Sequence, residues 1–125
     1  MSADSNLNFQ LQFVNQARES FSVFAVDIFV NNCQWISGEQ PKVGQVFKTG
    51  DSALWGVAAT IPNATASGEV RLKGSSGSTI GVQFNNLYNG IATVQVELSK
   101  GISYSIQSSS TGAQAYAKAI VTSGS

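Results

Sequence analysis

The feature that most constrains the fold is a run of alternating apolar and polar residues from Gly68 to Leu98. The apolar residues of this run fall on one parity in three groups: Val70 and Leu72; Ile80, Val82 and Phe84; and Ala92, Val94, Val96 and Leu98. Because side chains two residues apart in a β-strand point to the same face, each group predicts a strand with one buried face and one solvated face. The turn-forming residues of Gly74–Gly77 predict a hairpin loop between the first two groups. The loop Asn85–Gly90 separates the second group from the third.

The rest of the chain continues in the same style, with short apolar runs between turn-forming residues. Strands are expected near the N-terminus from Leu7 to Phe13, and over Phe21–Val30, Val43–Thr49, Ala53–Ala59 and Ile102–Ile106. Asn31–Gly44 is predicted to be a long connection, and Ala113–Val121 is predicted to be either a final strand or a short helix. Many short strands at close spacing are typical of antiparallel all-β folds. The prediction is an all-β, single-domain antiparallel β-sandwich of residues 1–125, with a barrel as the alternative.

Charge excludes several classes of partner. Seven basic and seven acidic residues give a formal net charge of zero, and charged residues make up only 11% of the 125 residues. Nucleic-acid binding needs clustered Lys and Arg, and no such cluster is present. The same shortage argues against electrostatic attraction to a membrane, but it leaves contact with a lipid headgroup or a glycan through aromatic and neutral polar groups open.

The N-terminal residues and the lengths of the apolar runs predict where in the cell the chain is found. No apolar run is long enough to form a transmembrane segment. Met1–Asp4 is not followed by the apolar stretch of a secretory signal, so the chain is expected to be cytoplasmic or released without a signal peptide. Asn63 begins an N-glycosylation sequon, which we expect to be unused without a secretory route.

The chain contains no histidine, which excludes histidine-based catalytic triads and histidine-ligated metal sites. Its one cysteine, Cys33, has no partner for an internal disulfide and is expected to be a small buried or half-buried residue. Paired carboxylates can hydrolyse glycosides, but Glu69 and Glu97 lie on the polar parity of their strands, where a solvated face is expected. We therefore expect no enzymatic activity, no metal and no cofactor.

Aromatic and asparagine residues are the remaining candidates for a binding site. Trp35 lies in the long connection, Trp55 follows a turn, and Tyr88 lies in the loop Asn85–Gly90. Such rings fill cores and also form ligand platforms, so both interpretations are open for each of them. The amides of that loop suit sugar hydroxyls or a lipid headgroup, and they are also ordinary turn residues. The candidate ligand-binding residues are Trp35, Trp55, Asn85, Asn86 and Tyr88.

The middle of the chain resembles the aegerolysins, small fungal and bacterial β-sandwich proteins. Lys48–Ser52 is similar to their Pro-Gly-Ser turn, and Ala66–Leu72 to their Gly-Thr-x-Gly-x-Phe-Asp-Leu strand. Ile80–Gly90 is similar to their Tyr-Trp-Asp-x-Pro-Trp-x-Gly stretch, with Tyr88 in place of a tryptophan and Leu87 in place of the proline.

The order and spacing of these motifs agree over roughly residues 43 to 98, about half of the chain. The N-terminal third departs from the family beyond its alternation. Residues 67–71 also resemble a Ser-Gly-x-x-Arg run of the actinoporin-like fungal fruit-body lectins, which are sandwiches as well. The resemblance implies a β-sandwich without enzymatic activity that binds membrane lipids or acts beside a partner protein. It also implies a contact patch that includes Trp35, Trp55, Asn85 and Tyr88.

Three functions follow as hypotheses. The first is a non-enzymatic protein that recognises a membrane lipid or a glycan through aromatic and asparagine-containing loops at one end of the sandwich. The second is an abundant structural or storage protein that self-associates, as a homodimer through a sheet edge, or one noted for an incidental property such as sweet taste. The third is a carboxylate-based glycosidase.

Overall fold

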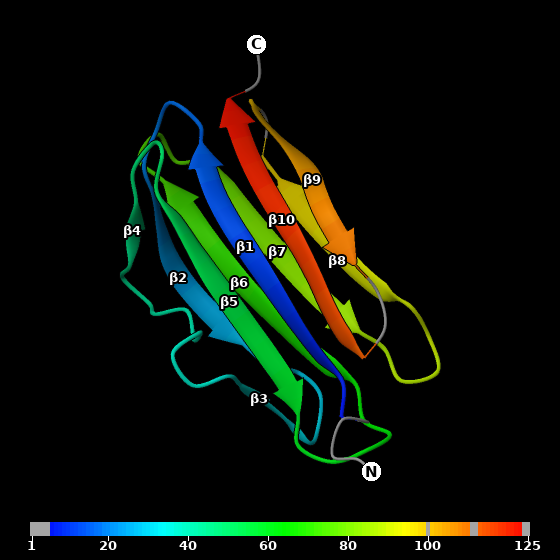
Figure 1. The fold of residues 1–125 in the computed structure, drawn as a ribbon. Coiled ribbons are helices and arrows are strands. Elements are labelled where there is room, and N and C mark those ends of the chain that lie inside the picture. The colour runs from blue at the N-terminus through cyan, green and yellow to red at the C-terminus, as the bar shows by residue number, and fades with distance from the viewer. Residues whose placement is uncertain (1–5, 100, 111–112, 124–125) are drawn as a thin grey trace.

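The computed structural model describes residues 6–99, 101–110 and 113–123, and these residues form ten β-strands and no helix. In chain order the strands are β1 (Asn8–Gln16), β2 (Phe21–Asp27), β3 (Cys33–Trp35), β4 (Val46–Phe47), β5 (Ser52–Ala59), β6 (Ala66–Gly74), β7 (Thr79–Asn86), β8 (Ala92–Leu98), β9 (Ile102–Ser110) and β10 (Gln114–Ser123). They pair into two five-stranded sheets in the orders β3-β5-β1-β10-β9 and β4-β2-β6-β7-β8 (Figure 1). The two sheets pack face to face, which confirms the predicted all-β sandwich.

Neighbouring strands run antiparallel, with the exception of the parallel pair β1 and β10 in the first sheet. The core lies between the sheets, where β1 contributes Phe9, Leu11 and Phe13 on one parity. Phe13 stacks on Trp55 of β5 with ring centroids 5.1 Å apart, and Phe47 meets Phe13 edge-on at 5.2 Å. Edge-to-face and stacked pairs of this kind add about 0.5–1.5 kcal/mol each beyond the burial of their area.

The alternation that predicted the sheet is confirmed in the second sheet. The inward residues of β6 and β7 are all buried: Val70, Leu72, Ile80, Val82 and Phe84. The inward residues of β8 are only partly buried because β8 is an edge strand with no neighbour beyond it.

Some element boundaries differ from the predictions. β2 ends at Asp27, so the apolar residues 28–30 belong to a loop instead of a strand. The predicted connection 31–44 contains β3, which adds to the edge of the first sheet by pairing with β5. The predicted strand 43–49 is reduced to the two residues of β4. Residues 114–123 form a strand, because β10 inserts between β1 and β9, which decides between the two predictions for this segment.

The two ends of the sandwich differ in polarity. The β2–β3, β5–β6 and β7–β8 loops meet at the end where β1 begins, the N-terminal end in Figure 1. The turns 17–20, 48–51 and 75–78 lie at the other end, where hydrogen bonds join them to one another and to the strands. These turns are polar. Among the described residues, no helix is long and apolar enough to cross a membrane.

Candidate functional site

Three loops with exposed apolar side chains form one end of the sandwich, which we call the apolar end and define as residues 28–32, 60–65 and 87–91. Within the described part of the chain, eleven large hydrophobic side chains are exposed, and five of them lie on these loops. They are Phe29 (68% exposed), Ile61 (45%), Leu87 (40%), Tyr88 (45%) and Ile91 (70%). The turns 17–20, 48–51 and 75–78 at the opposite end carry none of the eleven. The apolar surface is therefore concentrated where the loops gather.

Hydrogen bonds tie the three loops to one another. The backbone N–H of Thr60 donates to the carbonyl oxygen of Asn32 at 2.8 Å, which joins the first two loops. The backbone N–H of Tyr88 donates to Oγ1 of Thr65 at 3.1 Å, which joins the second and third loops. Side chains at the apolar end are thus carried on linked backbone, which limits their independent motion.

Each of the three loops also contains one asparagine in the left-handed region of backbone conformation. Asn32, Asn63 and Asn89 have φ angles of 59°, 63° and 61°. Asparagine tolerates this conformation better than other residues with a side chain, because its short amide bonds to the local backbone. Tyr88, directly before Asn89, is 45% exposed in the turn of the third loop.

The apolar end is electrically neutral. None of the sixteen residues in the three loops is charged. A hollow of about 290 Å³ lies beside the third loop, between Leu7 and residues 86–92. Moving such a surface into a less polar environment incurs no desolvation of a charge, and the exposed side chains gain from leaving water.

Of the five residues predicted as ligand contacts, only Tyr88 is exposed at the apolar end. Trp35 is half-buried on β3 and faces the core, with its ring 6.1 Å from that of Phe84. Gly68 makes this position possible, because a Cβ there would lie 2.8 Å from Cη2 of Trp35. Trp35 thus serves packing at the sheet edge, and the sequence did not show this because β3 falls in the predicted connection.

Trp55 is 1% exposed, so its ring is not available to a ligand. It packs between Phe13 and Phe47 at ring-centroid distances of 5.1 and 5.8 Å. The indole N–H finds no hydrogen-bond partner among the described residues. Of the two interpretations left open for this residue, the structure thus places Trp55 in the core, and it takes no part in the apolar end.

Asn85 and Asn86 are buried, and their amides are used inside the protein. The amide oxygen of Asn85 accepts a hydrogen bond from Oγ of Ser67 on the neighbouring strand. The Nδ2 of Asn86 donates to the carbonyl oxygen of Asn8 at 3.0 Å, on β1 of the other sheet, and to that of Ala113 at 3.2 Å, just before β10. The amide of Asn86 thus joins the two sheets behind the β7–β8 loop, whereas the amide of Asn85 bonds within its own sheet. Both side chains support the apolar end from inside the protein.

Phe29, Ile61 and Ile91 are exposed at the apolar end but are not among the residues that the sequence predicts as ligand contacts. Phe29 falls within the predicted strand Phe21–Val30, and Ile61 lies outside every predicted strand. Each of the three is a large apolar residue in an uncharged segment that also contains asparagine. This pattern indicates a shared surface only once the fold is known to bring the three loops to one end.

The two carboxylates considered for glycoside hydrolysis lie on the outer face of the second sheet. Glu69 is only 9% exposed, which corrects the prediction of a solvated side chain, and it pairs with Arg71 at 3.3 Å. Glu97 is exposed as predicted and lies on β8, with β7 between it and β6. No three His, Cys, Asp or Glu side chains in the described ranges are grouped to hold a metal ion.

Cys33 is half-buried, as predicted, and burial raises the pKa of its thiol. Its Sγ lies 3.7 Å from the carbonyl oxygen of Ser67, to which it donates, and 3.5 Å from the N–H of the same residue. A thiol in this setting holds its proton more firmly than a free cysteine, which makes Cys33 a packing residue.

The chain matches no protein-family model and no curated protein. Its fold is similar to those of solved structures, among them two crystal structures. The crystal structure of the lipid binding protein Nakanori aligns with a TM-score of 0.71 at 9% identity, over 92% of this chain and 70% of that one. The crystal structure of IP-1A from Alcaligenes faecalis aligns with a TM-score of 0.68 at 12% identity, over 95% and 92% of the two chains. At these identities the similarity shows a shared fold.

Proposed function

We propose that the protein is a non-enzymatic lipid-binding protein that docks on a membrane surface through its apolar end. The observation that carries this proposal is the gathering of five exposed apolar side chains on three linked loops that contain no charge. Side chains such as Phe29 and Ile91 would enter the boundary between headgroups and acyl chains. Tyr88 suits that boundary because its ring is apolar and its hydroxyl is polar.

Two further points support a lipid partner. A solved structure that shares this fold is that of a lipid binding protein. The resemblance of residues 43–98 to the aegerolysins leads to the same class of partner, and we propose membership of that family on this basis. A glycan partner for the apolar end is less well supported, because the amides of Asn85 and Asn86 are occupied inside the protein.

Flotation with phosphatidylcholine vesicles tests the proposal. The wild-type protein should float with the vesicles, and raising the salt concentration from about 0.1 to about 1 M should not release it, because no charge contributes to the contact. Ile91→Asp places a charge at the apolar end and should abolish flotation. Val43→Asp is the matched control, because Val43 is 67% exposed beside β4 and away from the three loops.

Two results would overturn the proposal. One is failure of the wild-type protein to float with any vesicle while it remains folded. The other is equal flotation of Ile91→Asp and the wild type.

A second candidate function, self-association through a sheet edge, is favoured by the length of β9. The edge strands on one side of the sandwich, β3 and β4, have three and two residues, whereas β9 on the other side has nine. Residues 102–110 include no charged side chain to discourage pairing, and Tyr104 and Ile106 are exposed. Sedimentation equilibrium should then show dimers that Ile106→Lys disperses, and a monomer at all concentrations would exclude this function.

We propose no catalytic role for the carboxylates. Glycoside hydrolysis needs two carboxyl groups that are free to act on the glycosidic bond. The carboxylate of Glu69 is already held by Arg71 in an ion pair at 3.3 Å, so it is not free in this sense.

A further inference from the structure

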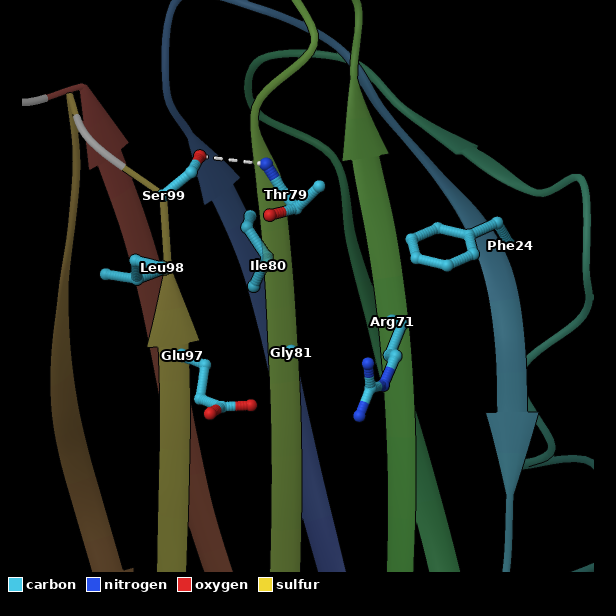
Figure 2. A pocket seen from close by; sticks show the side chains of 8 residues that line it. All are labelled: Phe24, Arg71, Thr79, Ile80, Gly81, Glu97, Leu98 and Ser99. Atoms are coloured by element: carbon cyan, nitrogen blue, oxygen red, sulfur yellow. Dashed lines mark hydrogen bonds between the residues drawn. The ribbon is translucent and has the colours of Figure 1, made fainter.

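A hollow on the outer face of the second sheet is centred on Gly81, in the interior of β7. It has a volume of about 330 Å³ and includes Phe24, Arg71 and Glu97 in its lining (Figure 2). A second hollow of about 290 Å³, lined by Glu69, Gln83 and Gln95, shares Gly81 and Glu97 with the first. The two hollows adjoin at these shared residues, on the side of the sheet that faces away from the core, and are together called the depression.

The packing of the protein does not explain why residue 81 is a glycine. At the strand glycines Gly56, Gly68 and Gly74, an added Cβ would clash with a side chain that lies over the strand. At Gly81 the nearest atom would be Oε1 of Glu97 at 3.7 Å, an ordinary contact. A glycine inside a strand destabilises the sheet, and such a glycine often marks a place where a ligand approaches the backbone closely.

An irregularity in β2 directs an aromatic ring to the same hollow. The register between β2 and β6 shifts between Val23 and Ala25, so Phe24 is the extra residue of a β-bulge. Bulges re-aim side chains and occur next to binding sites. Phe24 is 49% exposed and lines the hollow. It lies on β2, the strand next to β6, which carries Arg71 (Figure 2).

Charged groups stand on both sides of the glycine. Arg71 of β6 and Glu97 of β8 each pair with Gly81 across the sheet, so the two backbones are separated by about two strand spacings, or about 10 Å. Arg71 uses one N–H to bond Glu69 at 3.3 Å, and its side chain is half exposed, which leaves further donors for a ligand. Glu97 makes no hydrogen bond or ion pair with any residue that the structure describes, so its carboxylate is available as an acceptor.

This lining selects a class of ligand. Two carboxylates and one guanidinium give the depression an excess of negative charge, which disfavours phosphates and other anions. The amides of Gln83 and Gln95, with Arg71 and Glu97, offer both donors and acceptors, as hydroxyl groups require. A pyranose ring presents hydroxyls at its rim and C–H groups on its face, and the ring of Phe24 can pack against the latter. We propose that the depression over Gly81 is a binding site for a neutral saccharide.

A glycan array of neutral mono- and oligosaccharides tests the site, followed by NMR titration with the sugar that the array retains. The wild-type protein should bind, with shifts of the backbone amides of Gly81, Gln83 and Gln95. Gly81→Val fills the hollow and leaves the strand intact, so we expect binding to fall at least about tenfold, which corresponds to the loss of one good contact. Glu97→Gln removes the carboxylate at nearly constant size and should also weaken binding. Ser103→Val, on the exposed face of β9, is the control for a new β-branched side chain.

The site is independent of the proposed membrane contact, and the outcomes separate the two. Gly81→Val should float with phosphatidylcholine vesicles as the wild type does. Failure of the array to retain the wild-type protein would overturn the saccharide site, and so would retention that neither Gly81→Val nor Glu97→Gln weakens. Amide shifts confined to residues 87–91 would place the sugar at the apolar end and would also overturn this assignment.

Discussion

Replacing Phe29 by alanine should weaken binding to phosphatidylcholine vesicles without affecting the fold. Phe29 is 68% exposed at the apolar end. An aromatic side chain has about 200 Å² of surface, so about 140 Å² would leave water on full insertion, which is worth about 3.5 kcal/mol at about 25 cal/mol per Å². Insertion to half that depth gives about 1.7 kcal/mol, so the partition coefficient should fall by about 20- to 300-fold.

The assay is a vesicle titration followed by the bound fraction after centrifugation, with Val43→Ala as the control. Val43 is 67% exposed, so both changes remove apolar surface that is in water in the free protein. Both variants should keep the wild-type melting temperature, because exposed side chains contribute within about 0.5 kcal/mol to stability. A reduction below about threefold for Phe29→Ala, or an equal reduction for Val43→Ala, would refute insertion of the apolar end.

Three further predictions concern stability and reactivity. Asn15→Asp should lower the free energy of unfolding by about 3 kcal/mol in urea titrations. The buried Nδ2 of Asn15 donates to two carbonyl oxygens at 2.9 Å, which a carboxylate in its place would repel. A loss below about 1 kcal/mol would contradict this prediction. The backbone N–H of Ser76 donates to the carboxylate of Glu19 and lowers the pKa of that side chain. Glu19 therefore contributes stability above its unfolded-state pKa near 4.3, and this contribution is lost as the pH falls through the lower folded-state pKa. Glu19→Gln should lose less thermal stability than the wild type between about pH 5 and about pH 2, and identical pH profiles of the two proteins would contradict this prediction. Cys33 should react with iodoacetamide at neutral pH at least about tenfold more slowly in the folded protein than in urea, because burial raises the pKa of its thiol.

The alternating segment from Gly68 to Leu98 predicted strands that the structure confirms, because burial of one face imposes a period of two on any half-buried strand. The prediction failed where pairing partners decide the outcome. β3 is only three residues long and exists because β5 offers an unpaired edge, which no local pattern records. Residues 28–30 are apolar enough for a strand, but they lie in a loop at the apolar end. Tertiary context overrides local preference in both cases.

The sequence indicated only part of the apolar end, and the reason is geometric. Tyr88 stands out in the sequence as an aromatic residue in a polar loop, and it is exposed. Asn86 has the same local signature, yet it is buried, because its amide bridges to the other sheet. A turn-like sequence does not show whether an amide faces solvent or a strand 78 residues away. The sequence does not predict the hollow over Gly81 either, because the hollow exists only where the neighbouring strands leave this glycine uncovered.

The two proposed surfaces are oriented differently, and this restricts what they can bind together. The apolar end lies where β7 ends at Asn86, whereas the hollow surrounds Gly81 on the outer face of the same strand. Five residues of strand separate them, or about 17 Å at about 3.4 Å per residue. A chain that stands on a bilayer would hold the hollow at that height, beyond the reach of one sugar attached directly to a lipid. Vesicles that display a single-hexose glycolipid should therefore bind no more tightly than plain phosphatidylcholine vesicles, whereas an oligosaccharide long enough to span the gap should add to the affinity, because the second contact becomes intramolecular. Gly81→Val should remove only that added affinity.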